Sequence, residues 1–415
     1  MLCTHPDHPE LGVRLSYGLN LYPSRDADGV LRGLRELAIP LRARVAPGAR
    51  GFGVGAWLPA RAAREFLADE RRLDELVDVL AEGDLDACTF NAFPYGEFHG
   101  PGLKERVFTP AWMERARLDF TLDVARIAAH ARVRRGGSRA GQHLSLSTHA
   151  GGFAAALAPG DRELVVEAFV AAAVALSELE QELGERVVLA IEPEPRSSAN
   201  DTRELSELLA RVRERARGPA GEAVRRHLGA CLDTCHAAVE FEEPAQAFAR
   251  ATAEGTALGK LQFSSALALS RPDTDETGRA SFLALDEPVY LHQVTGRRAG
   301  ELLRAVDLAE LVRASASWRG CDEWRCHFHV PVDLSEFGGA GGLATTRADA
   351  ERTLLAALAA PERWGSRELH VEVETYTWSL FPEARAGTAG VLDGLARELT
   401  HVLRLLAGAG WRPLR

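Results

Sequence analysis

The sequence predicts an α/β fold in which eight strands close into a (β/α)8 barrel, the TIM-barrel architecture. Strand-like and helix-like segments alternate along all 415 residues, which indicates parallel strands joined by helical crossovers. The eight or nine strand–helix units exceed what one open mononucleotide-binding half-fold contains. We expect a single elaborated domain over residues 1–415, with residues 1–12 as an N-terminal tail and residues 266–325 as an insertion between the seventh and eighth barrel strands.

The composition bounds the class of protein. Hydrophobic residues make up 46% and charged residues 26%, which excludes a mainly disordered chain. The net charge of −10 argues against a dedicated nucleic-acid-binding protein, because no overall positive field would hold a polyanion. No secretory leader is evident, and the most apolar stretch, 165–176, is too short to span a membrane. We therefore expect a cytoplasmic protein, whose six cysteines do not indicate a disulfide framework.

The first half of the chain contains four predicted strands, each followed by signals of a helix. The strands are Leu15–Tyr22, Gly51–Leu58, Leu85–Phe93 and His143–His149. Pro59 suits the first turn of a helix, and Thr109 followed by Pro110 predicts the start of another. Gly53 and Gly55 lie inside a strand and precede no phosphate-facing helix, so we interpret them as allowing close packing rather than dinucleotide binding.

The second half repeats the pattern with an alanine-rich helix from Asp161 and helix caps at 200–202. The predicted strands are Val187–Glu192, Leu228–Asp233, Lys260–Ser264, Cys326–Val330 and Leu369–Glu374. The last two are separated from the others by the irregular segment that we assign to the insertion. The residues of this half therefore complete the set of strands that a barrel requires.

Polar residues share one face in five of these strands, most of them near the carboxyl end. The residues are Ser145, Ser147 and His149; Glu192 and Glu194; Lys260, Gln262 and Ser264; His327 and His329; and His370, Glu372 and Glu374. Ionisable side chains are rarely buried unless they are paired or bound to a metal. Each group alone could be a solvated or structural face, but together they predict a polar chamber at the mouth of the barrel.

The sharpest cluster is Cys231–His236. Asp233 ends a predicted strand and His236 follows one turn later, so a carboxylate oxygen and an imidazole nitrogen can converge on a divalent ion. In the alternative interpretation, Asp233 is an ordinary helix cap and His236 packs beneath it. The cysteines at either side, Cys231 and Cys235, are more consistent with core packing than with metal binding.

Glu192 in its Ala-Ile-Glu-Pro context and the Cys-Leu-Asp-Thr-Cys-His cluster resemble the xylose-isomerase-like barrels, a superfamily of sugar isomerases, epimerases and endonuclease IV-type enzymes. The resemblance implies a divalent metal ion (Mn, Mg, Co or Zn) held by Glu192, Asp233, His236 and Glu374. The donor expected at the seventh strand stays open between two residues. Gln262 fits by distance along the chain, and His329 fits because a helix and the last strand follow it.

Longer segments resemble the EboE family of bacterial metabolite-traffic proteins. These segments are Thr89–Gly100, Tyr290–Val294, Cys326–Pro331 and His370–Trp378. The resemblance implies a role in making or exporting a small metabolite, with a possible membrane-protein partner from the same operon. It implies no defined reaction.

The sequence is therefore consistent with three hypotheses of function. In a metal-dependent isomerase or epimerase, Glu192 and Glu374 would move a proton and Lys260 would stabilise an enediolate oxygen. The pocket would be shaped by Trp57, Glu97, His99, His149 and Glu372. An endonuclease IV-like phosphodiesterase is less consistent, because no His ends the second or third predicted strand. A non-enzymatic carrier for a membrane partner is the third hypothesis.

Overall fold

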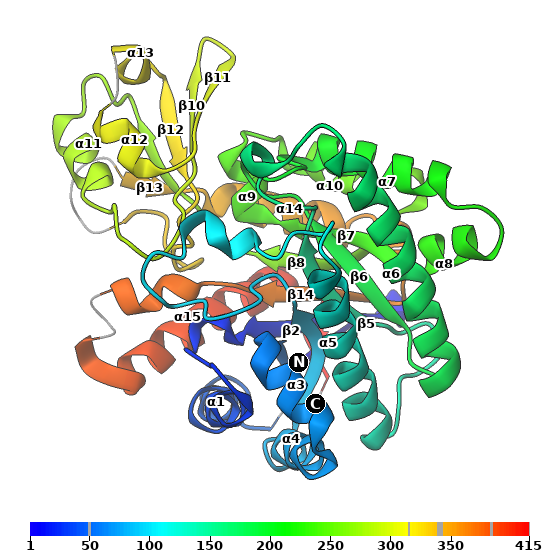
Figure 1. Cartoon of the computed structure of the whole chain (residues 1–415). Coiled ribbons are helices and arrows are strands. Elements are labelled where there is room, and N and C mark those ends of the chain that lie inside the picture. The colour runs from blue at the N-terminus through cyan, green and yellow to red at the C-terminus, as the bar shows by residue number, and fades with distance from the viewer. Residues whose placement is uncertain (49–50, 314–315, 338–342, 382–384, 415) are drawn as a thin grey trace.

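The computed structural model describes residues 1–48, 51–313, 316–337, 343–381 and 385–414. Eight parallel strands form a closed barrel, which confirms the predicted fold class (Figure 1). Closure follows from Val371, which pairs with Leu261 on one side and with Leu15 on the other. In order around the barrel the strands are β2 (His8–Gly18), β3 (Phe52–Trp57), β4 (Leu85–Asn91), β5 (Leu144–His149), β6 (Val187–Glu192), β7 (Leu228–Asp233), β8 (Ala257–Phe263) and β14 (Glu368–Val373).

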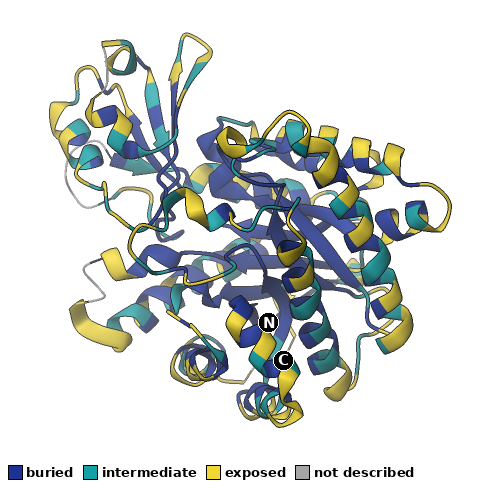
Figure 2. Ribbon diagram, in the orientation of Figure 1, coloured by how far each residue is buried: buried dark blue, intermediate teal, exposed yellow. Residues whose placement is uncertain are grey.

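Helices form the outer layer and connect successive strands. They are α1 (Ala27–Gly33), α2 (Ile39–Val45), α3 (Ala60–Ala68), α4 (Glu70–Glu82), α5 (Arg115–Arg134), α6 (Asp161–Leu183), α7 (Thr202–Arg215), α8 (Pro219–His227), α9 (Thr234–Val239), α10 (Pro244–Ala251), α14 (Arg347–Leu358) and α15 (Gly387–Gly408). Buried residues lie along the strands and on the inward faces of the helices (Figure 2). α5 begins later than expected, because Thr109 lies in a turn where its hydroxyl donates to the carbonyl of Arg106.

The first 12 residues form strand structure where we expected a tail. β1 (Leu2–His5) pairs antiparallel with β2 and with β15 (Arg412–Pro413), so the two ends of the chain lie side by side (Figure 1). The physical reason is burial: Met1 and Cys3 are both buried against the barrel.

None of the helices in the described ranges has the length and apolar character of a membrane span.

The glycines of β3 allow close packing, as the sequence suggested. A Cβ atom on Gly55 would collide with the carboxyl group of Glu372 across the inside of the barrel. A Cβ atom on Gly53 would collide with the backbone carbonyl of Leu15. Glycine at position 55 therefore makes room for a charged side chain inside the barrel, and glycine at position 53 allows the backbone of the neighbouring strand to approach closely.

A second, antiparallel sheet is inserted between β8 and β14 and stands beside one end of the barrel (Figure 1). Its strands, in spatial order, are β11 (Glu301–Ala305), β10 (Val294–Arg298), β12 (Glu323–Cys326), β9 (Leu267–Ser270) and β13 (Leu343–Thr345). The short helices α11 (Glu276–Leu283), α12 (Leu308–Val312) and α13 (Ala316–Arg319) belong to the same insertion.

The expected strand Cys326–Val330 differs from the structure. Only Cys326 belongs to a strand, β12, which pairs antiparallel with β9 and β10 outside the barrel. The following residues continue in extended form without a ladder: the N–H of His327 donates to Gln293 O and that of Val330 to Ser265 O. The alternating His-Phe-His-Val pattern therefore reflects a segment with one apolar side and one side facing the barrel mouth.

Candidate functional site

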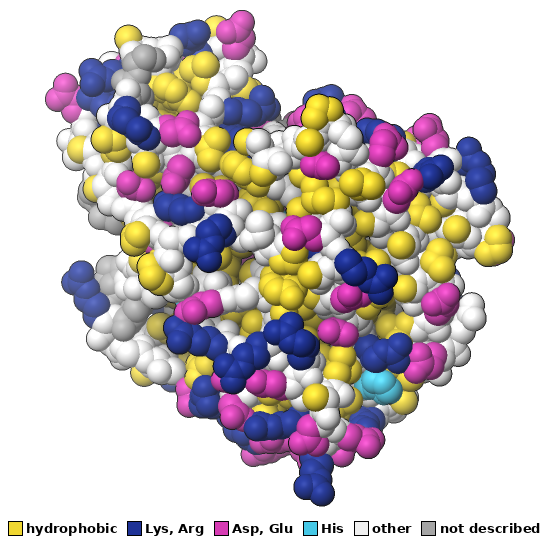
Figure 3. Space-filling model, in the orientation of Figure 1, with side chains coloured by type: hydrophobic (Ala, Val, Ile, Leu, Met, Phe, Trp, Pro, Cys, Tyr) yellow, Lys and Arg dark blue, Asp and Glu magenta, His cyan; other side chains and the backbone are white. Residues whose placement is uncertain are grey.

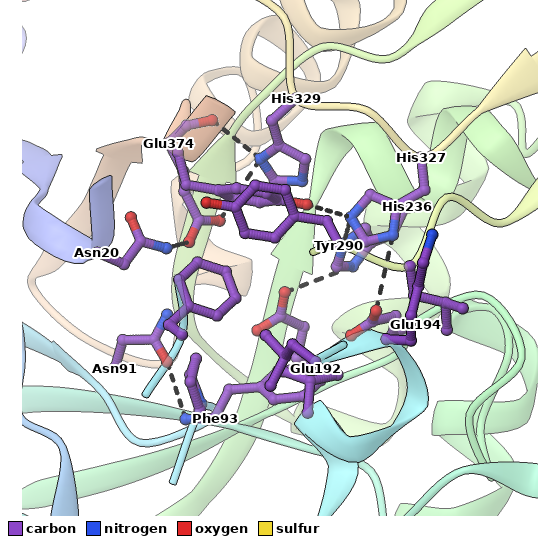
Figure 4. Close-up of a pocket in the computed structure, with 17 residues that line it drawn as sticks. Asn20, Asn91, Phe93, Glu192, Glu194, His236, Tyr290, His327, His329 and Glu374 are labelled. Carbon is purple, nitrogen blue, oxygen red and sulfur yellow. Dashed lines mark hydrogen bonds and ion pairs between the residues drawn. The ribbon is translucent and has the colours of Figure 1, made fainter. Parts of the chain in front are cut away.

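The carboxyl ends of three barrel strands bring the predicted acidic residues together. Glu192 is the last residue of β6, Asp233 is the last of β7, and Glu374 directly follows β14. One carboxylate oxygen from each lies within 4.8 Å of the other two. Glu192 and Glu374 line a pocket of about 520 Å³ at this end of the barrel (Figure 4). All three are at most 4% exposed.

Asp233 is both a helix cap and a member of this cluster. Its Oδ1 atom accepts hydrogen bonds from the N–H of His236 (2.9 Å) and from the Ser264 hydroxyl (2.7 Å) at the start of α9. Its Oδ2 atom has no hydrogen-bond partner in the described part of the chain. The cap interpretation thus accounts for one oxygen and leaves the other without a hydrogen-bond partner among the described residues.

His329 enters the pocket from the insertion. Its Nδ1 atom donates to the backbone carbonyl of Glu374 at 3.0 Å, so its Nε2 atom carries the lone pair. That Nε2 atom, like Glu192 Oε2, is buried without a partner among the described residues. His329, His236 and Asp233 also bring one ligand atom each within 4.8 Å of one another.

The cluster is short of positive charge. Lys104 is the sole lysine or arginine among the described residues of the pocket lining, and its ammonium group lies 2.8 Å from Asp307. Two ionised carboxylates at 4.8 Å repel by roughly 3 kcal/mol at an effective dielectric constant near 20. A bound cation would remove that repulsion.

The pKa values of the cluster reflect the same imbalance. Burial, followed by repulsion from Glu374 and Asp233, raises the pKa of Glu192 well above its usual value. Burial, followed by repulsion from Glu372 and Asp233, does the same to the pKa of Glu374. Burial alone would raise the pKa of Asp233, but the neighbouring imidazoles and its two hydrogen bonds lower it. Burial lowers the pKa of His329 to about 4, which keeps its ring neutral.

These residues fit a divalent metal ion. Carboxylate oxygens and neutral imidazole nitrogens are the donors that zinc, manganese and similar ions take in proteins. The His329 ring is oriented by an Nδ1–H···O=C bond, an arrangement common for metal-bound histidines. Cys235 also lies near His327 and His329, but its thiol is buried with Val239 and Ala266, and burial raises its pKa well above the usual value. Cys235 is therefore a core residue and a poor donor.

Gln262, Lys260 and Glu372 lie inside the barrel and do not line this pocket. The Oε1 atom of Gln262 accepts from the Cys231 thiol at 2.8 Å. The Lys260 ammonium group forms a buried ion pair with Glu372. Of the two residues considered for the seventh-strand donor, the structure brings His329 into the pocket.

The four other residues expected to shape the pocket lie around it. Trp57 donates to the Pro94 carbonyl and packs on Phe98, behind the pocket wall. His99 bridges the Tyr290 hydroxyl and the Asn20 carbonyl, each at 2.7 Å. The remaining two are further away.

His149 and Glu97 do not line the pocket themselves. His149 packs against Phe93 and Phe108 and is fully buried. Glu97 forms an exposed ion pair with Arg25.

Several lining residues had not been assigned to the site from sequence. They are Asn20, Asn91, Phe93, Pro94, Phe98, Leu103, Lys104, Val107, Tyr290, Leu291 and Tyr376. Glu194 and His327 also line the pocket and had been predicted only as part of the polar chamber, without a role as ligands. Asn20 holds Glu374 by donating to its Oε1 atom at 2.6 Å. A signal existed for Glu194 and His327, which alternate with Glu192 and His329, whereas Asn20 lies in a short 3-10 turn without a polar pattern.

No protein-family model matches the chain, and no curated protein matches it. Three solved structures are similar in architecture. They are the IolI protein with a bound zinc atom (TM-score 0.44, 12% identity, 96% of this chain and 99% of that one), a xylose isomerase domain-containing protein from Salmonella typhimurium LT2 (0.43, 14%, 94% and 97%) and a D-tagatose 3-epimerase-like protein (0.43, 9%, 94% and 98%). At these identities the likeness is one of fold.

Proposed function

We propose that this protein is a divalent-metal-dependent enzyme of the isomerase or epimerase type that acts on a small metabolite. The observation that carries the proposal is the set of unpartnered donor atoms at the barrel mouth: Glu192 Oε2, Asp233 Oδ2 and His329 Nε2. With Glu374 they would hold the ion. A bound ion would polarise a carbonyl or hydroxyl oxygen of the substrate.

Glu192 and Glu374 are the proposed proton-transfer pair. They lie on β6 and after β14, with β7 and β8 between them, so they approach the pocket from different sides (Figure 4). One carboxylate would take the proton from a carbon next to a carbonyl group, and a carboxyl group would return a proton to the same or the adjacent carbon. One C–H bond breaks and another forms, with no net oxidation. Lys260 has no part in this step because its ammonium group is paired with Glu372.

The pocket walls indicate the shape of the substrate. Above the acidic cluster they are aromatic or aliphatic, with Phe98, Tyr290 and Tyr376 in mutual ring contact. A substrate with an oxygen-rich end at the cluster and an apolar body against these rings would satisfy both regions.

Metal analysis followed by exchange with solvent deuterium tests the proposal. We expect purified protein to hold a stoichiometric divalent ion, and candidate hydroxy-carbonyl compounds to gain deuterium at carbon in D2O. Asp233→Ala should abolish both metal binding and exchange, whereas His130→Asn, on the outer helix α5, should change neither. Absence of an ion in the wild-type protein, after incubation with Zn or Mn, would refute the proposal.

The EboE-type role in metabolite traffic and the membrane partner stay predictions from the sequence segments. A pure carrier would bind its ligand unchanged, and Asp233→Ala would then weaken binding without any turnover to lose.

The phosphodiesterase hypothesis gains no support, because β3 and β4 end in Trp57 and Asn91 and offer no histidine there. Charges of both signs are spread over the face shown in Figure 3.

A further inference from the structure

A second group of metal donors lies beside the first, on the side of the pocket next to the insertion (Figure 4). Glu194, His236 and His327 each offer one ligand atom, and these atoms lie within 4.8 Å of one another. Each of these residues is 5% exposed. They come from the segment after β6, the first turn of α9 and the segment after β12. The group is therefore complete only when the insertion is present.

Hydrogen bonds determine which nitrogen of each ring carries the proton. Nδ1 of His236 lies 3.1 Å from the carbonyl oxygen of Pro193, which can only accept. Nδ1 of His327 lies 2.7 Å from Oε1 of Gln293. The orientation of that amide is fixed, because its Nε2 atom donates to Glu194 and to a backbone carbonyl. With one proton on each ring, that proton is therefore on Nδ1 and the lone pair is on Nε2.

The two Nε2 atoms face each other at 3.1 Å. Two lone pairs at this distance repel, and neither nitrogen can donate to the other. The hydroxyl of Tyr376 lies 3.4 Å from Nε2 of His327 and can donate a hydrogen bond to that nitrogen only. A cation that both nitrogens coordinate would turn the repulsion into binding.

We propose that Glu194, His236 and His327 bind a second divalent ion, next to the ion assigned to Glu192, Asp233, His329 and Glu374. The inference rests on the proposed function for the first ion. Two imidazoles and one carboxylate favour a borderline ion such as Zn²⁺ over Mg²⁺. Nε2 of His236 lies 4.0 Å from Oδ1 of Asp233, so the two ions would share one chamber. Such a pair suits a substrate with two neighbouring oxygen atoms.

Metal content of the full-length protein, measured after reconstitution with zinc and dialysis, tests the second site. We expect about two equivalents in the wild type and about one in His327→Asn and in Glu194→Gln, with the second dissociation constant raised on the order of 10–100-fold or more. Asp233→Asn should instead lose the ion of the first group. The variant His130→Asn, on the outer helix α5, should retain both ions.

The outcomes separate the two proposals. A wild-type protein with one equivalent that His327→Asn leaves unchanged overturns the second site and keeps the first. A wild-type protein with none overturns both. Reconstitution with Co²⁺ gives an independent readout, because loss of imidazole ligands should change the visible absorption of His327→Asn and leave that of His130→Asn as in the wild type. Circular dichroism checks folding, and Glu194→Gln provides the same test if His327→Asn does not fold.

Discussion

Two groups of buried charged and polar side chains occupy this barrel, and they differ in whether each charge has a partner. Inside the barrel, Lys260 and Glu372 form an ion pair, and the Ser145 hydroxyl contacts both Thr89 and His370. At the mouth, Glu192, Asp233 and Glu374 lie together with no lysine or arginine paired to them among the described residues. Glu192 Oε2 and Asp233 Oδ2 have no hydrogen-bond partner among the described residues, and Glu192 and Glu374 line the pocket.

The presence or absence of a cationic partner decides how a buried carboxylate should be interpreted. A carboxylate with a buried ammonium partner is part of the fold, because removal of either partner leaves an uncompensated charge. A group of carboxylates without a cation is destabilising by itself, and its persistence indicates a ligand. Glu372 and Glu374 are separated by a single residue and fall on opposite sides of this distinction.

The largest expected effect is on the interior pair. Lys260→Met leaves Glu372 buried without a cation, and we expect a loss of about 3–5 kcal/mol in the free energy of unfolding. Denaturant titration of the protein in the presence of excess chelator measures this change in the free energy of unfolding. The double variant Lys260→Met/Glu372→Leu should recover most of the loss, because both charges are then absent. A single-variant loss below about 1 kcal/mol would contradict the structural role of the pair.

The next effect concerns Glu398, a buried carboxyl group outside both clusters. It accepts hydrogen bonds from Tyr17, Trp378, Thr375 and the N–H of Val332, yet burial raises its pKa from 4.5 to about 7. A raised carboxyl pKa favours the fold most below about pH 4.5, and this stabilisation is lost as the pH rises through about 7. At about 1.4 kcal/mol per pKa unit, the loss is about 3 kcal/mol.

Glu398→Gln should remove this pH dependence, because an amide does not titrate in this range. Unfolding at about pH 5 and about pH 8 provides the measurement, with exposed Glu10→Gln as the matched control. If wild type and Glu398→Gln lose stability in parallel between these pH values, Glu398 is not the group responsible.

A matched pair of Glu→Gln variants, one in each group of buried charges, tests whether the two groups differ in stability. In metal-free protein near neutral pH, Glu192→Gln should stabilise the fold by about 2 kcal/mol, because it relieves repulsion from Asp233 and Glu374. Glu372→Gln should destabilise it, because Lys260 loses its partner. Thermal unfolding with excess chelator measures both changes. Changes of the same sign in the two variants would remove the distinction between the clusters.

The barrel and its acidic strand ends were predictable because parallel strands place their carboxyl ends at one edge. Glu192, Asp233 and Glu374 could therefore be grouped from three separate segments. The sequence could not separate Glu372 from Glu374, since alternation gives the face of a strand and not the partner of a charge. Alternation also placed Lys260 in the site, because it does not show that Glu372 is the partner of this lysine.

The contribution of the insertion was harder to predict. Residues 326–330 have the alternation of a strand, and only the backbone hydrogen bonds distinguish an extended segment from a ladder. The choice between Gln262 and His329 thus depended on a chain path that periodicity does not encode. The aromatic wall at Tyr290 comes from the same insertion, where no regular spacing marks which side chains reach the pocket.

The smallest expected effect concerns Gln293, which links the insertion to the second group of donors. Its side chain accepts from Nδ1 of His327 and donates to Glu194, so it sets the tautomer of one ligand and the position of another. Gln293→Met should raise the dissociation constant of the second zinc ion on the order of tenfold, about 1.4 kcal/mol, and leave that of the first ion unchanged. Competition with a zinc chelator measures each constant. Equal weakening of the binding of both ions would show that Gln293 supports the pocket as a whole, because its side chain bonds directly to His327 and Glu194, two ligands of the second ion.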